Sequence, residues 1–284
     1  MFKKRIGLAL GGGGAKGLAH IGVLKFLEET KIGIDYVAGT SIGAIIGALH
    51  CLGYNADEIK QIAEKIKVKK LLDPTFPKKG LIKGDKLETY LRKIFENKKF
   101  SDLKKPMFVV ATDIKNFQEV IFNKGDLAKA VRASISIPGI FHPVINNKRI
   151  LVDGGILENL PIKVLKNQNV KKIIAVNLEK EKINNEIYDE TILEKDSSEL
   201  PSIFETLSNS YAMIDGNQIK NILENSDNSV LVISPDLKGI NIQDFNKAKK
   251  IYQIGYNCAK NNHKKINSLI QKDNIFKKIR TLWK

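Results

Sequence analysis

The stretch DYVAGTSIGAIIGALHCLG, residues 35–53, decides the fold class. Its first part has the length and apolar character of a buried strand, and its second part reads as a buried helix. Between them lies Gly39-Thr40-Ser41-Ile42-Gly43, whose two glycines permit a sharp turn. The uncharged run from Tyr36 to Ala56 is long enough to span a bilayer. Its glycines and polar residues favour a strand, a turn and a helix within a globular core.

The same alternation of strand and helix continues along the chain. We expect further strands at 4–10, 105–114, 171–178 and 229–237, helices at 17–30 and 126–136, and a hairpin at 143–153 that turns at Asn146-Asn147. Strands that alternate with helices indicate an α/β protein with a mainly parallel sheet, covered by helices on both faces.

The remaining segments indicate one domain with surface insertions. Residues 55–100 are lysine-rich and are expected to be helical, with a loop at DPTFPKKGLIKGD. Residues 179–200 are acidic and polar without an apolar period, which predicts a mobile surface loop. Residues 261–284 form a basic tail that carries the only tryptophan. Two cysteines are too few for a disulfide framework, so a reducing, cytoplasmic compartment is expected.

The formal net charge of the 284-residue chain is +16. Such a charge either serves solvation or attracts an anionic partner such as a membrane surface. Both interpretations remain open on the sequence. We expect no nucleic acid partner, because no basic stretch carries the interleaved aromatic residues that stack on single strands.

A glycine-rich loop, Gly11 to Gly17, directly follows the first expected strand and precedes a helix. Unshielded amides and a helix N-terminus favour an anion, either a phosphate or the oxyanion of an acyl-transfer intermediate. The spacing Gly12-x-Gly14-x-x-Gly17 also fits a dinucleotide fingerprint. That fingerprint needs an acidic residue at the end of the second strand, whereas Asp35 precedes its strand.

Ser41 lies in a setting typical of a nucleophile elbow, between a strand and a helix. The amide of Ile42 opens that helix and can stabilise an oxyanion. The alternative is a serine that simply caps a helix. Asp153-Gly154-Gly155 follows another strand, where a plain Asp-Gly turn is the alternative. A serine nucleophile needs a base, and His142 is the one histidine that rivals Asp153 for this role.

Together these motifs resemble the patatin-like phospholipase family. The resemblance rests on GGGAKG, GTSIG and DGG in that order. It extends through AHIGVLKFLEE, ATDI, AVRASISIPGIFHPV, ILVDGGILENLP and IIAVNL, over residues 5–260.

The resemblance implies a three-layer α/β/α fold related to cytosolic phospholipase A2, and hydrolysis of lipid acyl esters. It implies Ser41 as nucleophile and Asp153 as general base, without histidine, metal or cofactor. The oxyanion hole is expected from the amides of Gly12, Gly13 and Gly14, with Ile42 as a further donor. The supporting glycines of the three motifs are Gly17, Gly39, Gly43, Gly154 and Gly155.

Two cations are candidate contacts for an anionic substrate group, Lys16 in the first turn of its helix and Arg132. For each, the alternative is a side chain with a packed stem and a solvated head. The expected partner is a lipid at an anionic membrane surface, reached peripherally through the lysine-rich residues 60–105 and the end of the basic tail, residues 276–284. The oligomeric state stays open. Two other functions also stay open: a phosphate-binding regulator without catalysis, and an esterase or thioesterase for soluble substrates.

Overall fold

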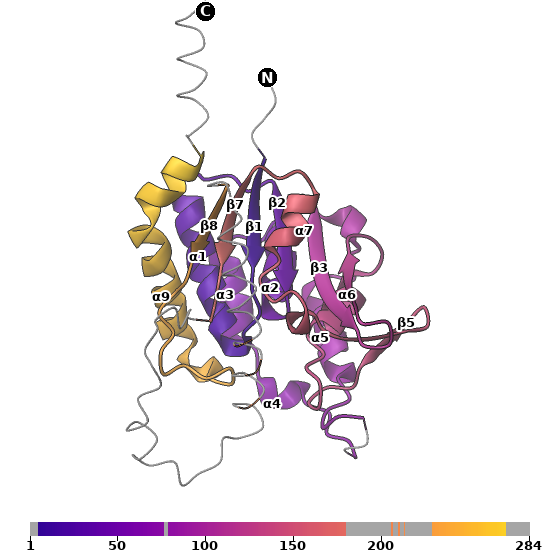
Figure 1. The fold of residues 1–284 in the computed structure, drawn as a ribbon. Helices are drawn as coiled ribbons and strands as arrows, with labels where there is room; N and C mark the ends of the chain where they lie inside the picture. The colour runs from indigo at the N-terminus through magenta and orange to yellow at the C-terminus, as the bar shows by residue number, and fades with distance from the viewer. Residues whose placement is uncertain are drawn as a thin grey trace, which may run out of the picture.

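Five parallel strands form the centre of the sheet, in the order β3-β2-β1-β7-β8 (Figure 1). The structure is a computed structural model that describes residues 5–76, 79–179 and 229–270 together with positions 206, 210 and 213. The predicted loop beyond Glu179 and the tail beyond residue 270 lie outside the described residues. The bounds of the parallel strands are β1 (Ile6–Leu10), β2 (Tyr36–Thr40), β3 (Met107–Asp113), β7 (Lys172–Val176) and β8 (Val230–Ile233).

Three antiparallel strands extend this sheet on the β3 side: β4 (Gln118–Phe122), β5 (Val144–Asn146) and β6 (Arg149–Asp153). The predicted hairpin is therefore confirmed as β5 and β6, but its turn was placed one residue too early. Asn147 and Lys148 occupy the turn, with φ angles of 48° and 65°. β4 was not expected from the sequence, because its polar residues interrupt the apolar pattern of a core strand.

The edge of β3 that faces β2 is shared by two strands. β2 runs parallel to β3 and ends with Thr40 opposite Val110. β6 runs antiparallel to β3 and ends with Asp153 opposite Ala111. β4 occupies the opposite edge of β3. The strands β2 and β6 therefore meet end to end on the shared edge, with their carboxyl ends together. This register brings Ser41, the residue after β2, next to Asp153, although 112 positions separate them in the sequence.

Helices cover both faces of the sheet, which confirms the expected three-layer α/β/α architecture. Alternate residues of β1 point to opposite faces, as strand geometry requires: Leu8 packs with α1, α2 and α9, whereas Ala9 packs with α7. None of the described helices is both long and apolar enough to cross a membrane. The helix bounds are α1 (Leu18–Glu29), α2 (Ile42–Leu52), α3 (Ala56–Glu64), α4 (Val68–Leu71), α5 (Asp85–Ile94), α6 (Leu127–Ser134), α7 (Ile162–Asn167) and α9 (Ala248–Asn261).

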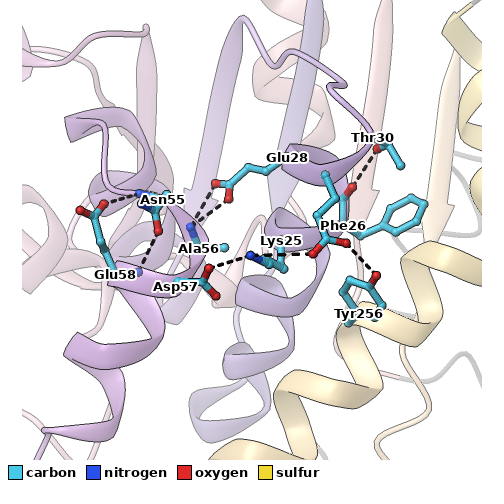
Figure 2. Close-up of polar contacts among 10 residues, drawn as sticks. Lys25, Phe26, Glu28, Thr30, Asn55, Ala56, Asp57, Glu58 and Tyr256 are labelled. Atoms are coloured by element: carbon cyan, nitrogen blue, oxygen red, sulfur yellow. Dashed lines mark hydrogen bonds and ion pairs between the residues drawn. The ribbon is translucent and has the colours of Figure 1, made fainter.

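Polar contacts tie α1 to its neighbouring helix α3 (Figure 2). The Glu28 carboxylate accepts the backbone amide of Ala56 at 3.1 Å, at the start of α3, where amides lack partners within the helix. Lys25 donates to Asp57 at 2.6 Å. Because α1 follows the glycine-rich loop almost directly, these contacts also hold the helix that orients the loop.

α1 and α9 cross so closely that glycine is needed on both helices (Figure 1). A Cβ atom on Gly22 would lie 2.1 Å from the Tyr252 carbonyl oxygen, and one on Gly255 would lie 2.0 Å from that of Ala19. Neither carbonyl can move without displacing its helix. The packing of α9 on α1 therefore depends on these two residues.

We predict that Gly22→Ala lowers the free energy of unfolding by about 1–3 kcal/mol, because the added methyl group forces the two helices apart. Gly33→Ala is the matched control, since a Cβ there meets no atom within 4 Å, and it should change stability by less than about 0.5 kcal/mol. Urea denaturation followed by circular dichroism measures both. Equal stabilities of the Gly22→Ala variant and the wild type would contradict the close crossing.

Candidate active site

Ser41 occupies a strained turn between β2 and α2. Its φ and ψ angles are 53° and −123°, a conformation that residues with a side chain rarely adopt. The turn is held on both sides, because the Ser41 amide donates to the Ser134 hydroxyl at 2.9 Å and the Ser41 carbonyl accepts the amide of Ala44 at 2.9 Å. The side chain of Ser41 makes no helix-capping bond to the backbone. The alternative of a plain capping serine therefore does not describe this residue.

The Ser41 hydroxyl donates to Oδ2 of Asp153 at 2.7 Å. The other carboxylate oxygen, Oδ1, accepts the amide of Gly155 at 2.8 Å, and the Asp153 amide donates to the Ser136 carbonyl at 2.9 Å. Both members of the pair are buried, with 8% of Ser41 and 3% of Asp153 exposed. The carboxylate is thus fixed in place with one oxygen left for the serine.

Burial raises the pKa of Asp153 from 3.8 to about 6, against the opposing hydrogen bonds from Gly155 and Ser41. A carboxylate in an apolar environment is a stronger base than one in water. At neutral pH it is still mostly ionised, so it can accept a proton. A base with a pKa close to the working pH can also return that proton to a leaving group.

The glycine-rich loop lies beside this pair. A Cβ atom on Gly12 would lie 3.2 Å from the Cβ of Ser41, which shows how closely the loop backbone approaches the serine. Gly13 and Gly14 have φ angles of 147° and 57°, which favour glycine. Their amides and that of Ile42, the first residue of α2, donate to no partner among the described residues.

The Gly12 amide, in contrast, donates to the Asn159 carbonyl at 3.2 Å. The expectation that Gly12 supplies an oxyanion donor is therefore corrected, because this amide already has an acceptor. The peptide before it is also held, since Nε2 of the buried His20 lies 2.8 Å from the Gly11 carbonyl. Burial lowers the pKa of His20 to about 4, so the ring is neutral and donates this bond.

The two predicted anion contacts have partners within the protein. Lys16 donates to both carboxylate oxygens of Glu179 at 2.9 Å. Arg132 is buried and donates to the carbonyls of Lys83, Gly84 and His142, and to the Ser136 hydroxyl. These partners give both side chains a structural role: Lys16 pairs with the carboxylate of Glu179, and Arg132 binds backbone segments together because it is buried among carbonyl groups. A contact of either cation with a substrate anion stays a prediction.

The supporting glycines of the motifs lie at or beside the turns between strands and helices. Gly39 ends β2 with Thr40, Gly43 is in α2, and Gly154 and Gly155 follow β6. A Cβ atom on Gly17 would lie 2.3 Å from the Ile42 side chain, so this glycine allows the loop to pack on the elbow.

The other candidate residues have no hydrogen bond to Ser41 or Asp153 among the described contacts. The Ser41 hydroxyl donates to Asp153, whereas the His142 ring makes no hydrogen bond among the described residues through Nε2. Cys51 is buried, and burial raises the pKa of its thiol to about 12. Asp35 accepts the Ile6 amide at the start of β1, at the wrong end of β2 for a nucleotide ribose.

Four residues that support the site were not predicted: His20, Ser134, Ser136 and Asn159. All four lie within the stretches that carry the family resemblance, such as AVRASISIPG and ILVDGGILENLP. Their residue types alone gave no signal, because their roles depend on hydrogen bonds between segments that are distant in the sequence.

Comparison with known proteins agrees with this geometry. Residues 8–166 match the model of the patatin-like phospholipase family. Because this match covers more than half of the 284 residues, the chain belongs to that family. The matched region includes β2, β6, Ser41 and Asp153.

Two curated relatives show the range of this similarity. Patatin-like phospholipase domain-containing protein 6 of Homo sapiens is 37% identical over 181 residues, which cover 61% of this chain and 13% of that protein. An uncharacterized NTE family protein of Mycobacterium tuberculosis is 39% identical over 177 residues, covering 61% of this chain and 49% of the relative. The chain thus spans less than half of each relative.

Solved structures share the fold at low sequence identity. VipD from Legionella pneumophila superposes with a TM-score of 0.62 at 16% identity, covering 93% of this chain and 67% of that one. ExoU from Pseudomonas aeruginosa, in its complex with SpcU, gives a TM-score of 0.52 at 15% identity over 94% of this chain and 53% of ExoU. These two similarities concern the fold.

We predict that the rate at which a fluorophosphonate modifies Ser41 falls below about pH 6, because protonated Asp153 cannot accept the serine proton. The rate should drop about tenfold for each further pH unit. A pH series of labelling rates, with circular dichroism to confirm folding at each pH, measures this. A fall that begins only near pH 4 would show that the carboxyl has its ordinary pKa.

Proposed function

We propose that this protein is a serine hydrolase that cleaves acyl ester bonds of lipids, of the phospholipase A or lysophospholipase type. The observation that carries the proposal is the 2.7 Å hydrogen bond from a serine in a strained elbow to a buried carboxylate. Membership of the patatin-like phospholipase family supports a lipid as the substrate. The proposed activity needs neither a cofactor nor a metal.

In the proposed reaction, Oγ of Ser41 attacks the ester carbonyl carbon while Asp153 accepts the hydroxyl proton. The carbonyl oxygen becomes an oxyanion, which the amides of Gly13, Gly14 and Ile42 stabilise. One such donor typically lowers the barrier by about 3 kcal/mol. The C–O bond of the substrate then breaks, and Asp153 returns its proton to the leaving alcohol.

The second half repeats these roles with water. Asp153 accepts a proton from a water molecule whose oxygen attacks the acyl-serine carbonyl. The tetrahedral intermediate collapses, the acid leaves, and Asp153 returns the proton to Oγ of Ser41. The raised pKa of Asp153 suits both directions of proton transfer.

We predict that Ser41→Ala abolishes hydrolysis of lysophospholipid and of a soluble p-nitrophenyl ester, because the nucleophile is removed. The fold should stay intact, since alanine keeps the Cβ atom of serine at this backbone conformation and removes only the hydroxyl that donates to Asp153. Continuous assays and a thermal melt test both statements. Residual turnover above a tenth of the wild-type rate would rule out Ser41 as nucleophile.

Two further variants compare the candidate bases. Asp153→Asn should reduce kcat by at least about a thousandfold, within the range expected for loss of a general base. His142→Ala should retain more than half of the wild-type kcat. If both variants lost activity equally, the assignment of the base to Asp153 alone would be wrong.

The same assays separate lipid hydrolysis from the soluble esterase alternative. A lipid hydrolase should turn over lysophospholipid above its critical micelle concentration faster than below it. A regulator that only binds phosphate would hydrolyse neither substrate and would not react with a fluorophosphonate.

A further inference from the structure

A short antiparallel hairpin with exposed apolar side chains follows α4. The Thr75 amide donates to the Leu81 carbonyl and the Lys83 amide donates to the Asp73 carbonyl, both at 3.0 Å. Phe76 is 76% exposed and Leu81 is 41% exposed. Large apolar side chains in water are unfavourable, and their position on a short hairpin points to contact with something outside the chain.

Exposed lysines lie on the hairpin and on the helix that precedes it. Lys67, Lys69 and Lys70 belong to α4 and its N-cap, and Lys79 precedes Leu81 in the hairpin. None of these four makes an ion pair with any residue that the structure describes. The neighbouring carboxylates have other partners, because Asp73 accepts amides at the start of α5 and Asp85 pairs with Lys83. Residues 65–86 contain eight lysines and two aspartates, so the region keeps a net positive charge.

The hairpin is attached directly to the segment that supports the proposed base. Ile82 pairs with Phe141, and Arg132 donates to the Lys83 carbonyl at 2.8 Å. Arg132 also donates to the hydroxyl of Ser136, whose carbonyl accepts the Asp153 amide. Figure 1 shows α4 at the same end of the sheet as the carboxyl ends of β1 and β2. The apolar and basic residues are thus at the active-site end of the molecule.

We infer that Lys67, Lys69, Lys70, Phe76, Lys79 and Leu81, here called the basic hairpin surface, bind the anionic surface of a phospholipid bilayer. Cationic side chains attract anionic head groups, and a few apolar groups enter the boundary with the acyl chains. This combination favours a bilayer over a nucleic acid, because a bilayer offers both anionic head groups for the lysines and an acyl region for an aliphatic side chain such as Leu81. This inference rests on the proposed function, because the purpose of membrane binding is to deliver lipid to Ser41.

Vesicle cosedimentation tests this surface on the full chain. All proteins carry Ser41→Ala so that the lipid stays intact, and the vesicles contain either phosphatidylcholine alone or phosphatidylcholine with phosphatidylglycerol. We expect binding to the anionic vesicles at 50 mM salt and at least tenfold weaker binding at 500 mM salt. At the higher salt, the reach of a charge falls well below the ~10 Å found at 0.1 M.

The double variant Lys69→Glu/Lys70→Glu should bind anionic vesicles at least tenfold more weakly, and Phe76→Ser at least threefold more weakly. Lys31→Glu/Lys171→Glu is the matched charge control, because it makes the same change at two exposed sites that precede β2 and β7, at the end of the sheet opposite to the carboxyl ends of the parallel strands. Phe117→Ser is the matched apolar control, since Phe117 is 88% exposed in another turn. Both controls should bind within twofold of the parent protein.

Three results would overturn the inference: equal losses from a variant and its control, equal binding to neutral and anionic vesicles, or tighter binding to single-stranded RNA than to the vesicles. The soluble ester assay with intact Ser41 keeps the two proposals distinguishable. Loss of vesicle binding together with unchanged kcat/KM for the soluble ester supports the surface. Vesicle binding that depends on the surface, in a wild-type protein that hydrolyses no ester, would contradict only the proposed function.

Discussion

The candidate site depends on one feature of the sheet, which is that β2 and β6 share a single edge of β3. Because Thr40 lies opposite Val110 and Asp153 opposite Ala111, the two strands end at neighbouring positions of the same strand. β2 cannot continue without colliding with β6. The chain therefore turns away at Ser41, and the same turn brings the serine hydroxyl to the carboxylate. Loss of either pairing would separate the two residues.

This arrangement lowers the free energy of unfolding, and packing and hydrogen bonds elsewhere in the fold compensate for the loss. A residue held at an unfavourable positive φ typically costs about 1–3 kcal/mol. The rise in the pKa of Asp153 from 3.8 to about 6 corresponds to roughly 3 kcal/mol at neutral pH. The buried core of β1, α1 and α2 holds both groups in place. Hydrogen bonds add to this, because Ser134 and Ser136 accept the backbone amides of the two residues and Gly155 donates to the carboxylate. A strained serine and a desolvated carboxylate are thus kept together before any substrate arrives.

Much of this arrangement could be predicted from the sequence. Apolar runs of strand length placed the five parallel strands, and glycines with Ser41 between two such elements placed the elbow. Asp153 could be singled out only by its motif, since an Asp-Gly pair is also an ordinary turn. β4 could not be predicted because it pairs only with β3, and exposed residues such as Gln118 interrupt its apolar pattern.

Interactions between distant segments could not be predicted from the sequence. Whether Gly12 offers a free amide depends on the Asn159 carbonyl, which lies 147 positions later in the sequence. Lys16 and Arg132 looked like anion contacts because their acceptors, Glu179 and the carbonyls near Gly84, are remote in the chain. Local pattern describes backbone conformation well, but the partners of a buried polar group are determined by tertiary packing.

The central claim is that Ser41, activated by Asp153, carries the acyl group between the two half-reactions. Acid-quenched mass spectrometry of the protein during turnover of a slowly hydrolysed p-nitrophenyl ester tests it most directly. The account predicts a species heavier by one acyl group, with the added mass on the peptide that contains Ser41, and no such species for Asp153→Asn. Turnover without any acylated protein, or an acyl group on a different residue, would contradict it.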